Sequence, residues 1–163
     1  MSVSILVRPV QKDDLEGVAR LAAQLVLYHH ALDARRFMLV DGVEQGYRRF
    51  FEAELSNPDA VLLCAVRVSD GQIVGYTYGT VEPRDWNALL DRHGALHDVL
   101  VDPGTRRTGV GERLVLETCR RLAELGAPRV VLHTAVQNQE AQALFAKLGF
   151  RATMIEMTRE TSA

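Results

Sequence analysis

The chain has 163 residues, 47% of them hydrophobic, enough for one domain with a full-sized core and little room for a second. Its net charge of -2 and isoelectric point near 6.2 argue against a nucleic-acid binder. No signal peptide is evident, and no apolar run approaches the length of a membrane span. Because its two cysteines lack metal-ligand spacing, we expect a reduced, cytoplasmic protein with no metal site and no nucleic-acid or membrane partner.

The start of the chain predicts one strand followed by two helices. Residues 3–10 are apolar and β-branched enough for a strand. An acidic capping box, Asp13-x-x-Glu16, predicts the start of an amphipathic helix. Residues 28–37 break its apolar pattern and indicate a loop or a bent continuation. A second helix is expected over residues 43–55, ended by Pro58, so that the two helices form one wall of a cleft.

A hairpin and a long connection come next. The Asp70-Gly71 turn joins strands expected over residues 61–68 and 73–81. Gly75 and Gly79 in the second strand indicate a bulge, a close approach by a ligand or a crowded sheet face. Residues 82–94 form a polar connection long enough for a loop at the mouth of a cleft. We expect this loop and residues 28–37 to build the pocket for an acceptor substrate.

The stretch from Leu96 to Gly111 organises the rest of the chain. An apolar strand leads through a Pro-Gly turn into Arg106-Arg107-Thr108-Gly109-Val110-Gly111, and a helix follows over residues 109–125. Glycine lets the backbone approach a ligand closely, and the first N–H groups of a helix have no intrahelical acceptor. The order therefore predicts a phosphate-binding turn, although an ordinary glycine-rich turn explains this short pattern equally well when it is taken alone.

The remaining sequence predicts a strand, a helix and a closing strand. The strand over residues 129–135 and the one over residues 96–101 form a right-handed βαβ unit around the intervening helix. Asn138 is the expected N-cap of the last helix, which Gly149 ends. Residues 150–159 are expected to add the strand that closes the sheet.

In combination, these features resemble the GNAT superfamily of N-acetyltransferases. Arg106 to Gly111 match its Q/R-x-x-G-x-G/A pyrophosphate motif, and the segment from Asn138 to Phe150 resembles its N-x-x-A-x-x-x-Y-x-K-x-G-F ending. The resemblance implies an α/β (α+β) fold, in the order β-α-α-β-β-β-α-β-α-β, as one domain over residues 1–163. Its mixed sheet would splay open between the two central strands. The resemblance further implies transfer of the acetyl group of acetyl-CoA to a primary amine, on a small molecule or a protein.

The resemblance also assigns residues to the co-substrate. The pantetheine arm would pair with the backbone of residues 99–101, and the diphosphate would rest on N–H groups from about Arg107 to Glu112. Asn138 would reach the pantetheine arm or the thioester, although helix capping also explains its presence. The full set expected beside acetyl-CoA is Val99, Leu100, Val101, Arg106, Arg107, Thr108, Gly109, Val110, Gly111, Glu112, Asn138 and Phe145.

Transfer to an amine requires a base, and three side chains are candidates: His97, Asp98 and Glu82. A lysine-like amine has a pKa near ~10.4, so its deprotonation at neutral pH costs about 4–5 kcal/mol. Strand alternation puts His97 on one face with Val99 and Val101, and puts Asp98 on the other face with Leu96 and Leu100, unless a bulge intervenes. One of the two is expected to face the cleft. Neither cysteine has a nucleophile's setting, so direct attack by the amine is expected.

Two departures from the family carry consequences. Phe145 stands where many members have a tyrosine thought to protonate the leaving thiolate, and phenylalanine cannot donate a proton. Water, Tyr76 or Tyr78 would have to serve instead, and the alternative is a non-catalytic acyl-CoA-binding or sensory module. After Phe150 the sequence holds one further strand where the family commonly has two. The resulting sheet edge would be left open or covered by a second subunit in a homodimer.

Overall fold

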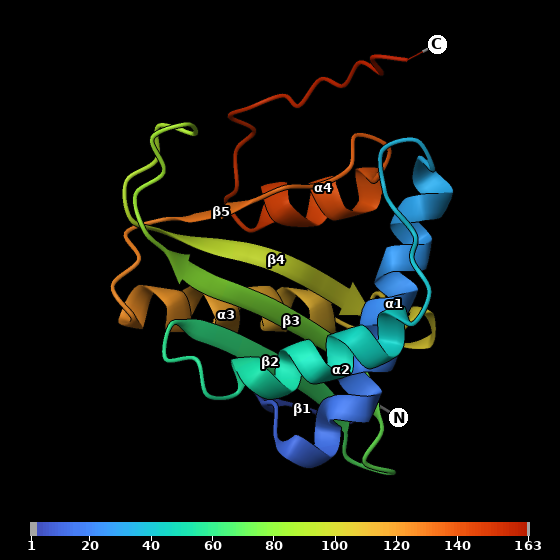
Figure 1. Cartoon of the computed structure of the whole chain (residues 1–163). Coiled ribbons are helices and arrows are strands. Elements are labelled where there is room, and N and C mark those ends of the chain that lie inside the picture. The colour runs from blue at the N-terminus through green and yellow to red at the C-terminus, as the bar shows by residue number, and fades with distance from the viewer. Residues whose placement is uncertain (1–2, 163) are drawn as a thin grey trace.

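Five strands form one mixed sheet in the computed structural model, which describes residues 3–162 (Figure 1). The sheet runs in the order β1 (Ile5–Pro9), β2 (Ala60–Arg67), β3 (Ile73–Glu82), β4 (His93–Val101) and β5 (Val130–Leu132). The first four strands pair antiparallel, and β5 pairs parallel to β4. The α-helices are α1 (Leu15–Leu32), α2 (Val43–Glu54), α3 (Val110–Glu124) and α4 (Gln139–Lys147). The predicted mixed α/β architecture is confirmed.

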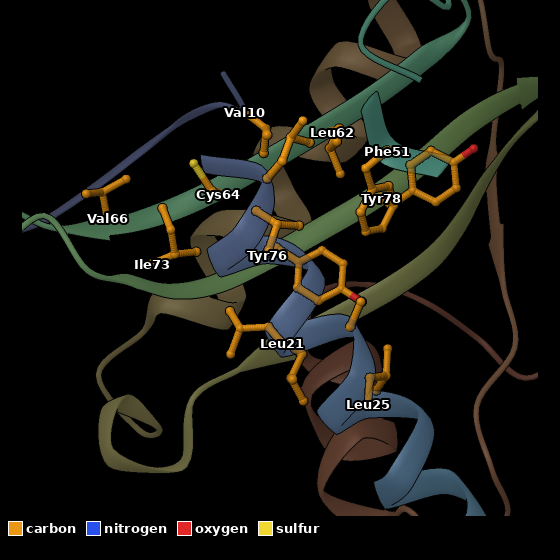
Figure 2. Close-up of a cluster of buried hydrophobic side chains, with 14 residues drawn as sticks. Val10, Leu21, Leu25, Phe51, Leu62, Cys64, Val66, Ile73, Tyr76 and Tyr78 are labelled. Carbon is orange, nitrogen blue, oxygen red and sulfur yellow. The ribbon is translucent and has the colours of Figure 1, made fainter. Parts of the chain in front are cut away.

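Helices α1 and α2 pack on one face of the sheet. Figure 2 shows how Leu21 and Leu25 of α1 and Phe51 of α2 meet Tyr76 and Tyr78 of β3. The Phe51 ring lies 5.8 Å from the Tyr76 ring and 5.5 Å from the Tyr78 ring, each in an edge-to-face arrangement. Such aromatic pairs favour this geometry, so the cluster fixes how α2 lies across the sheet.

Helix α3 covers the opposite face so closely that two glycines are needed beneath it. A Cβ atom on Gly79 would lie 2.9 Å from the Ala95 carbonyl oxygen and 3.3 Å from Leu122. A Cβ atom on Gly75 would lie 3.1 Å from Leu114. Crowding on the sheet face, one of the three explanations that the sequence left open, applies at both positions. A bulge, another of the three, also lies beside each glycine, because the strand register shifts next to Gly75 and next to Gly79.

A β-bulge interrupts the pairing of β3 with β4. Tyr78 lies opposite Asp98 and Gly79 lies opposite Leu96, so His97 is an extra residue in β4. Before the bulge, Leu96 packs in the cluster on the α3 and α4 side, whereas Leu100 after it packs in the α1 cluster. The alternation predicted for an unbroken strand, with Leu96 and Leu100 on one face, is therefore wrong, because an extra residue reverses the faces.

The sheet opens between β4 and β5. Their parallel pairing covers three pairs, from Gly94 opposite Val130 to Leu96 opposite Leu132. Strand β4 continues to Val101, and no later β4 to β5 pair exists within residues 3–162. The strand predicted over residues 129–135 is accordingly shorter than expected. The sheet splays between β4 and β5 as the resemblance implied, but β5 is the edge strand of the sheet that residues 3–162 form and not one of two central strands.

Both ends of α1 differ from the sequence expectation. The expected capping box at Asp13 does not form, because residues 12–14 make a 3-10 turn in which Asp14 accepts from the Gln11 N–H at 2.8 Å. The same carboxylate bonds Arg8 of β1 at 2.6 Å, which fixes the turn against the sheet. At its other end α1 continues to Leu32, so part of the expected loop is helical. None of the helices in the described part of the chain is long and apolar enough to cross a membrane.

The predicted closing strand is absent. Residues 151–160 have no strand assignment and are exposed throughout. Phe150 still packs its ring on Phe145 at 5.7 Å, and beyond it the chain turns away from α4 (Figure 1). Without backbone pairing to β5, residues 151–160 are not part of the sheet, so the expectation of a closing strand is wrong.

Candidate functional site

The turn before α3 has the conformation that the glycine pattern predicts. Gly109 is the N-cap of α3 in the left-handed region, with φ of 79°, and Arg107 is left-handed as well, with φ of 61°. The Thr108 hydroxyl donates to the Thr105 carbonyl at 2.6 Å, and Thr105 is itself buried. Glycine adopts positive φ without strain, whereas a non-glycine residue held there is often part of a binding site.

This turn leaves a row of main-chain donors without acceptors. Within residues 3–162, no acceptor takes the N–H groups of residues 107–112, and the first helical bond of α3 runs from the Arg113 N–H to Gly109 at 3.1 Å. Alternating left- and right-handed residues point successive N–H groups into one concavity, which suits an anion. The positive end of the α3 dipole lies at the same place. Backbone geometry thus fits a diphosphate.

The other residues expected beside acetyl-CoA surround this turn. Val99 and Val101 lie on the stretch of β4 that β5 leaves unpaired, and their side chains are half-buried on the α3 side. The Leu100 side chain instead points into the α1 core. Its backbone groups face β3, because the Asp102 N–H bonds the Val74 carbonyl at 2.8 Å and polar groups alternate along the strand, so those of Val99 and Val101 face the open edge. Arg106 is exposed and its Nε donates to the Val101 carbonyl at 3.3 Å, which ties the turn to the end of β4.

Helix α4 borders the splay and supplies the remaining two expected residues. Asn138 caps it, accepting the Ala141 N–H at 3.1 Å, so the capping interpretation is confirmed. Phe145 is buried with Leu96 and Val115, where it packs and offers no proton donor. An ion pair of 2.6 Å between Lys147 and Glu112 joins α4 to the first turn of α3.

The bulge brings the three candidate bases to one face of the sheet. His97 stacks on Tyr78 with ring centroids 5.3 Å apart, so it lies on the same face as Asp98 and not with Val99 as expected. Its Nε2 lies 2.8 Å from the Thr80 hydroxyl and 3.5 Å from Glu82. The Thr80 hydroxyl also bonds Glu82. The Thr80 hydroxyl has one hydrogen, which it donates to Glu82, so it must accept the hydrogen bond from His97 Nε2–H. Nδ1 is then the ring nitrogen that can accept a proton.

Asp98 is the most enclosed of the three. The Tyr76 hydroxyl donates to its Oδ2 at 3.1 Å. Burial raises the pKa of the Asp98 carboxyl above its usual value, while the Tyr76 hydrogen bond and nearby His97 and His29 act in the opposite direction. Burial also raises the pKa of Tyr47 to about 12, with the Asp98 charge as a second cause. Asp98 therefore lies in surroundings of low polarity, where an unpaired cation is attracted strongly.

Two of the three candidate bases, His97 and Asp98, line a pocket of about 310 Å³ between the sheet and α2. Its walls are the aromatic rings of Tyr47, Phe50 and Tyr78, and its floor holds His97 and Asp98. The Tyr78 hydroxyl donates to Glu54 of α2 at 2.6 Å. We expected residues 28–37 and the connection after Glu82 to build the acceptor pocket. That expectation is wrong, because neither segment lines this pocket.

Sequence reasoning therefore missed the contribution of α2. On this helix Phe50 is 45% exposed and borders the pocket, whereas its neighbour Phe51 is fully buried in the core. Helical periodicity alone cannot separate a core residue from a pocket residue on the same face. Among the described residues, no group of three or more His, Cys, Asp or Glu is placed to hold a metal ion.

Comparison with known proteins adds independent support for the family. Residues 26–150 match the model of the acetyltransferase (GNAT) family. A mycothiol acetyltransferase of Nocardioides sp. is 33% identical over 99 residues, which is 58% of this chain and 34% of that protein. The mycothiol acetyltransferase of Amycolatopsis mediterranei is 30% identical over 142 residues, covering 86% of this chain and 44% of that protein. The chain thus spans less than half the length of these curated relatives.

Among solved structures, aminoglycoside N-acetyltransferase AAC(6')-Iy in complex with CoA superimposes with a TM-score of 0.79 and 19% identity. The match covers 100% of this chain and 98% of that one, which shows that the two share a fold. The family model spans the pocket on α2, the splay and the turn before α3. On this match, the chain belongs to the acetyltransferase (GNAT) family.

Proposed function

We propose that this chain is an acetyl-CoA-dependent N-acetyltransferase that acetylates a primary amine. The observation that carries the proposal is the row of unpaired N–H groups over residues 107–112, placed at the end of the splay between β4 and β5. Residues 107–112 would bind the diphosphate, and the unpaired edge of β4 would bind the pantetheine arm. Acetyl-CoA bound there supplies the activated acetyl thioester.

The pocket on α2 would receive the amine. An ammonium group is attracted by the buried carboxylate of Asp98 and by the faces of Tyr47 and Tyr78. The names of the relatives given above refer to mycothiol and to aminoglycosides, whereas the acceptor class proposed for this chain rests on the pocket itself. The pocket, of about 310 Å³ and lined by three rings, has room for a small primary amine or for the amine-bearing end of a larger acceptor.

His97 is the proposed base. With Nε2–H held by Thr80 and Glu82, its Nδ1 takes the proton from the ammonium, and Glu82 stabilises the imidazolium that forms. The freed amine then forms the new N–C bond as the C–S bond breaks, and the thiolate leaves with the electron pair. The second amine proton and the thiolate together give free thiol, so one proton is released overall. Main-chain N–H groups at the open edge of β4 are donors for the developing negative charge.

Phe145 supports one alternative, a module that binds acyl-CoA without catalysis, because this side chain is buried and cannot protonate a thiolate. Release of CoA thiol in the presence of a panel of small primary amines, diamines and peptides separates the two. An N-acetyltransferase releases thiol only when an acceptor amine is present, in amounts equal to the acetylated product. Tight binding of acetyl-CoA with no acceptor-dependent thiol release across the panel would favour the binding module.

A further inference from the structure

Asp98 is an enclosed carboxylate whose hydrogen bonds are incomplete. It lines the pocket on α2, and among the described residues its one hydrogen-bond donor is the Tyr76 hydroxyl, 3.1 Å from Oδ2. The side chains that line this pocket include no lysine and no arginine. Because a buried carboxylate without a paired cation destabilises a fold, one that lies at the wall of a cavity points to a cationic ligand.

The carboxylates around this pocket outnumber the basic groups. Glu82 lies 3.5 Å from His97 Nε2, and Glu54 accepts a hydrogen bond of 2.6 Å from the hydroxyl of one wall ring. The basic groups that act on Asp98 are the imidazoles of His97 and His29. Charges attract strongly where water is displaced, so an acceptor with a single positive charge leaves part of this negative field unbalanced.

His97 and Asp98 lie side by side on the floor of the pocket but have different neighbours. His97 faces Glu82 through Nε2, which leaves Nδ1 for a proton. Asp98 lies toward Tyr47, because its charge helps to raise the pKa of that phenol. Consecutive Cα atoms are about 3.8 Å apart, so two nitrogens joined by a few carbon atoms can contact both side chains at once.

The walls of the pocket suit a short alkyl chain. The rings of Phe50 and Tyr78 meet edge to face with their centroids 5.5 Å apart, and Tyr47 completes the wall. Aromatic rings pack against methylene groups, and their faces attract a cation. Within residues 3–162 the Tyr47 hydroxyl has no hydrogen-bond partner, so it can accept a hydrogen bond from an ammonium beside Asp98.

We propose that the acceptor is a short α,ω-diamine, bound with one nitrogen at His97 and the other at the Asp98 carboxylate. This inference rests on the proposed function, because it names the amine that the pocket on α2 receives. The nitrogen at His97 loses its proton to Nδ1 and takes the acetyl group, whereas the nitrogen at Asp98 stays an ammonium. After the proton transfer each positive charge has a carboxylate beside it, because the imidazolium faces Glu82 and the ammonium faces Asp98.

A diamine held in this way should be acetylated once. The product carries an uncharged amide at one end, so a second round with its free amine at His97 would leave Asp98 without a cation. We expect diaminobutane to give the monoacetyl product, with the second acetylation slower than the first by about 10-fold or more. Mass spectrometry of the products over time measures both rates.

Acceptor-dependent release of CoA thiol with diaminobutane and with butylamine tests the role of the second nitrogen. We expect kcat/KM to be about 10-fold or more higher for the diamine, and lower for aminobutyrate, which has a carboxylate at that end, than for either. Asp98→Asn should reduce the preference for the diamine to less than about 3-fold. Asp13→Asn, an exposed residue outside the pocket, is the matched control and should keep the preference.

Equal kcat/KM values for the two amines in the unsubstituted chain would overturn the proposal. An Asp98→Asn variant that slows both amines by the same factor would also overturn it, because Asp98 would then serve the reaction or the fold and not the second nitrogen.

Calorimetric titration of the two amines without acetyl-CoA separates this proposal from acetyl transfer itself. If no amine releases thiol, but diaminobutane binds about 10-fold or more tightly than butylamine and Asp98→Asn removes the difference, the diamine site stands and the proposed function is wrong. If no amine releases thiol and the two amines bind equally, both proposals are wrong.

Discussion

The position of the proposed base, His97, depends on a single bulge in β4. An unbroken β4 would direct it toward α3, whereas the extra residue turns it onto Tyr78 and within 3.5 Å of Glu82. His97 thus joins the aromatic pocket and a carboxylate partner, as a base for an ammonium group requires.

Replacement of this base should slow the chemistry and spare co-substrate binding. We predict that His97→Gln lowers kcat by about 10²–10⁴-fold, because glutamine can keep the bond to Thr80 but cannot accept a proton. The affinity for acetyl-CoA should be unchanged in a binding titration. His133→Gln, an exposed histidine beyond β5, serves as the control and should keep the unsubstituted kcat. A kcat for His97→Gln within twofold of the unsubstituted value would exclude His97 as the base.

Asp98 gives a prediction with a definite sign. Its folded-state pKa is raised by burial, so the folded protein binds this proton more tightly than the unfolded chain does. At a pH below the pKa that Asp98 has in the unfolded chain, the buried carboxyl is neutral and does not destabilise the fold. At a pH above its raised folded-state pKa, the buried charge destabilises the fold in full. We predict that Asp98→Asn raises Tm at pH 7, and that the difference disappears as the pH falls through the carboxyl range. Thermal melts at several pH values would contradict this if the variant melted lower at pH 7.

At the scale of elements, the junction of β1 with α1 depends on one ion pair. Arg8 and Asp14 lie 2.6 Å apart and are largely shielded from water, and the Arg8 hydrogen bond lowers the pKa of the Asp14 carboxyl. A carboxyl with a lowered pKa stabilises the fold above its unfolded pKa and loses that contribution as the pH falls through the folded value.

We predict that Asp14→Asn lowers the free energy of unfolding by about 1.5–3 kcal/mol at neutral pH, because it breaks a charged hydrogen bond. The loss should shrink as acid protonates Asp14 in the unsubstituted chain. Asp13→Asn is the neighbouring control, and its exposed side chain should change the free energy of unfolding by less than about 0.5 kcal/mol. Urea unfolding measures the free energy of unfolding of both variants. Equal decreases in the two would show that the Arg8–Asp14 ion pair does not stabilise the junction of β1 with α1.

On the scale of the whole molecule, local signals in the sequence predicted the order of strands and helices up to α4. Glycine and proline mark where elements end, and Asn138 and Gly149 bound α4 as predicted. A bulge was one of the interpretations of Gly79, which lies at the bulge, but the sequence could not place the extra residue at His97, because an extra residue leaves no signature in the alternation of a strand this short. The strand expected over residues 150–159 was wrong for a different reason. A strand exists only where a neighbouring strand supplies backbone hydrogen bonds, and the residues of the segment itself say nothing about that neighbour.

The candidate site was also predicted only in part. Residues 106–111 revealed the turn, since positive φ at Gly109 and free N–H groups follow from local sequence. The pocket on α2 could not be predicted, because it arises where Phe50, Tyr78 and Asp98 come together from three separate elements. The sequence therefore predicted the turn, which depends on neighbouring residues, but not the pocket, which depends on how distant elements pack together.

The measurement that tests the account most directly is a calorimetric titration of acetyl-CoA into three proteins: the unsubstituted chain, Gly109→Glu and Gly71→Glu. Both glycines have positive φ, 79° and 71°, and open space where a Cβ would lie, so the two substitutions impose similar backbone strain. Only Gly109→Glu puts bulk and negative charge beside the N–H groups of residues 107–112. The account predicts that binding is lost in Gly109→Glu and retained in Gly71→Glu. Equal affinity in all three proteins, or no binding to the unsubstituted chain, would contradict it.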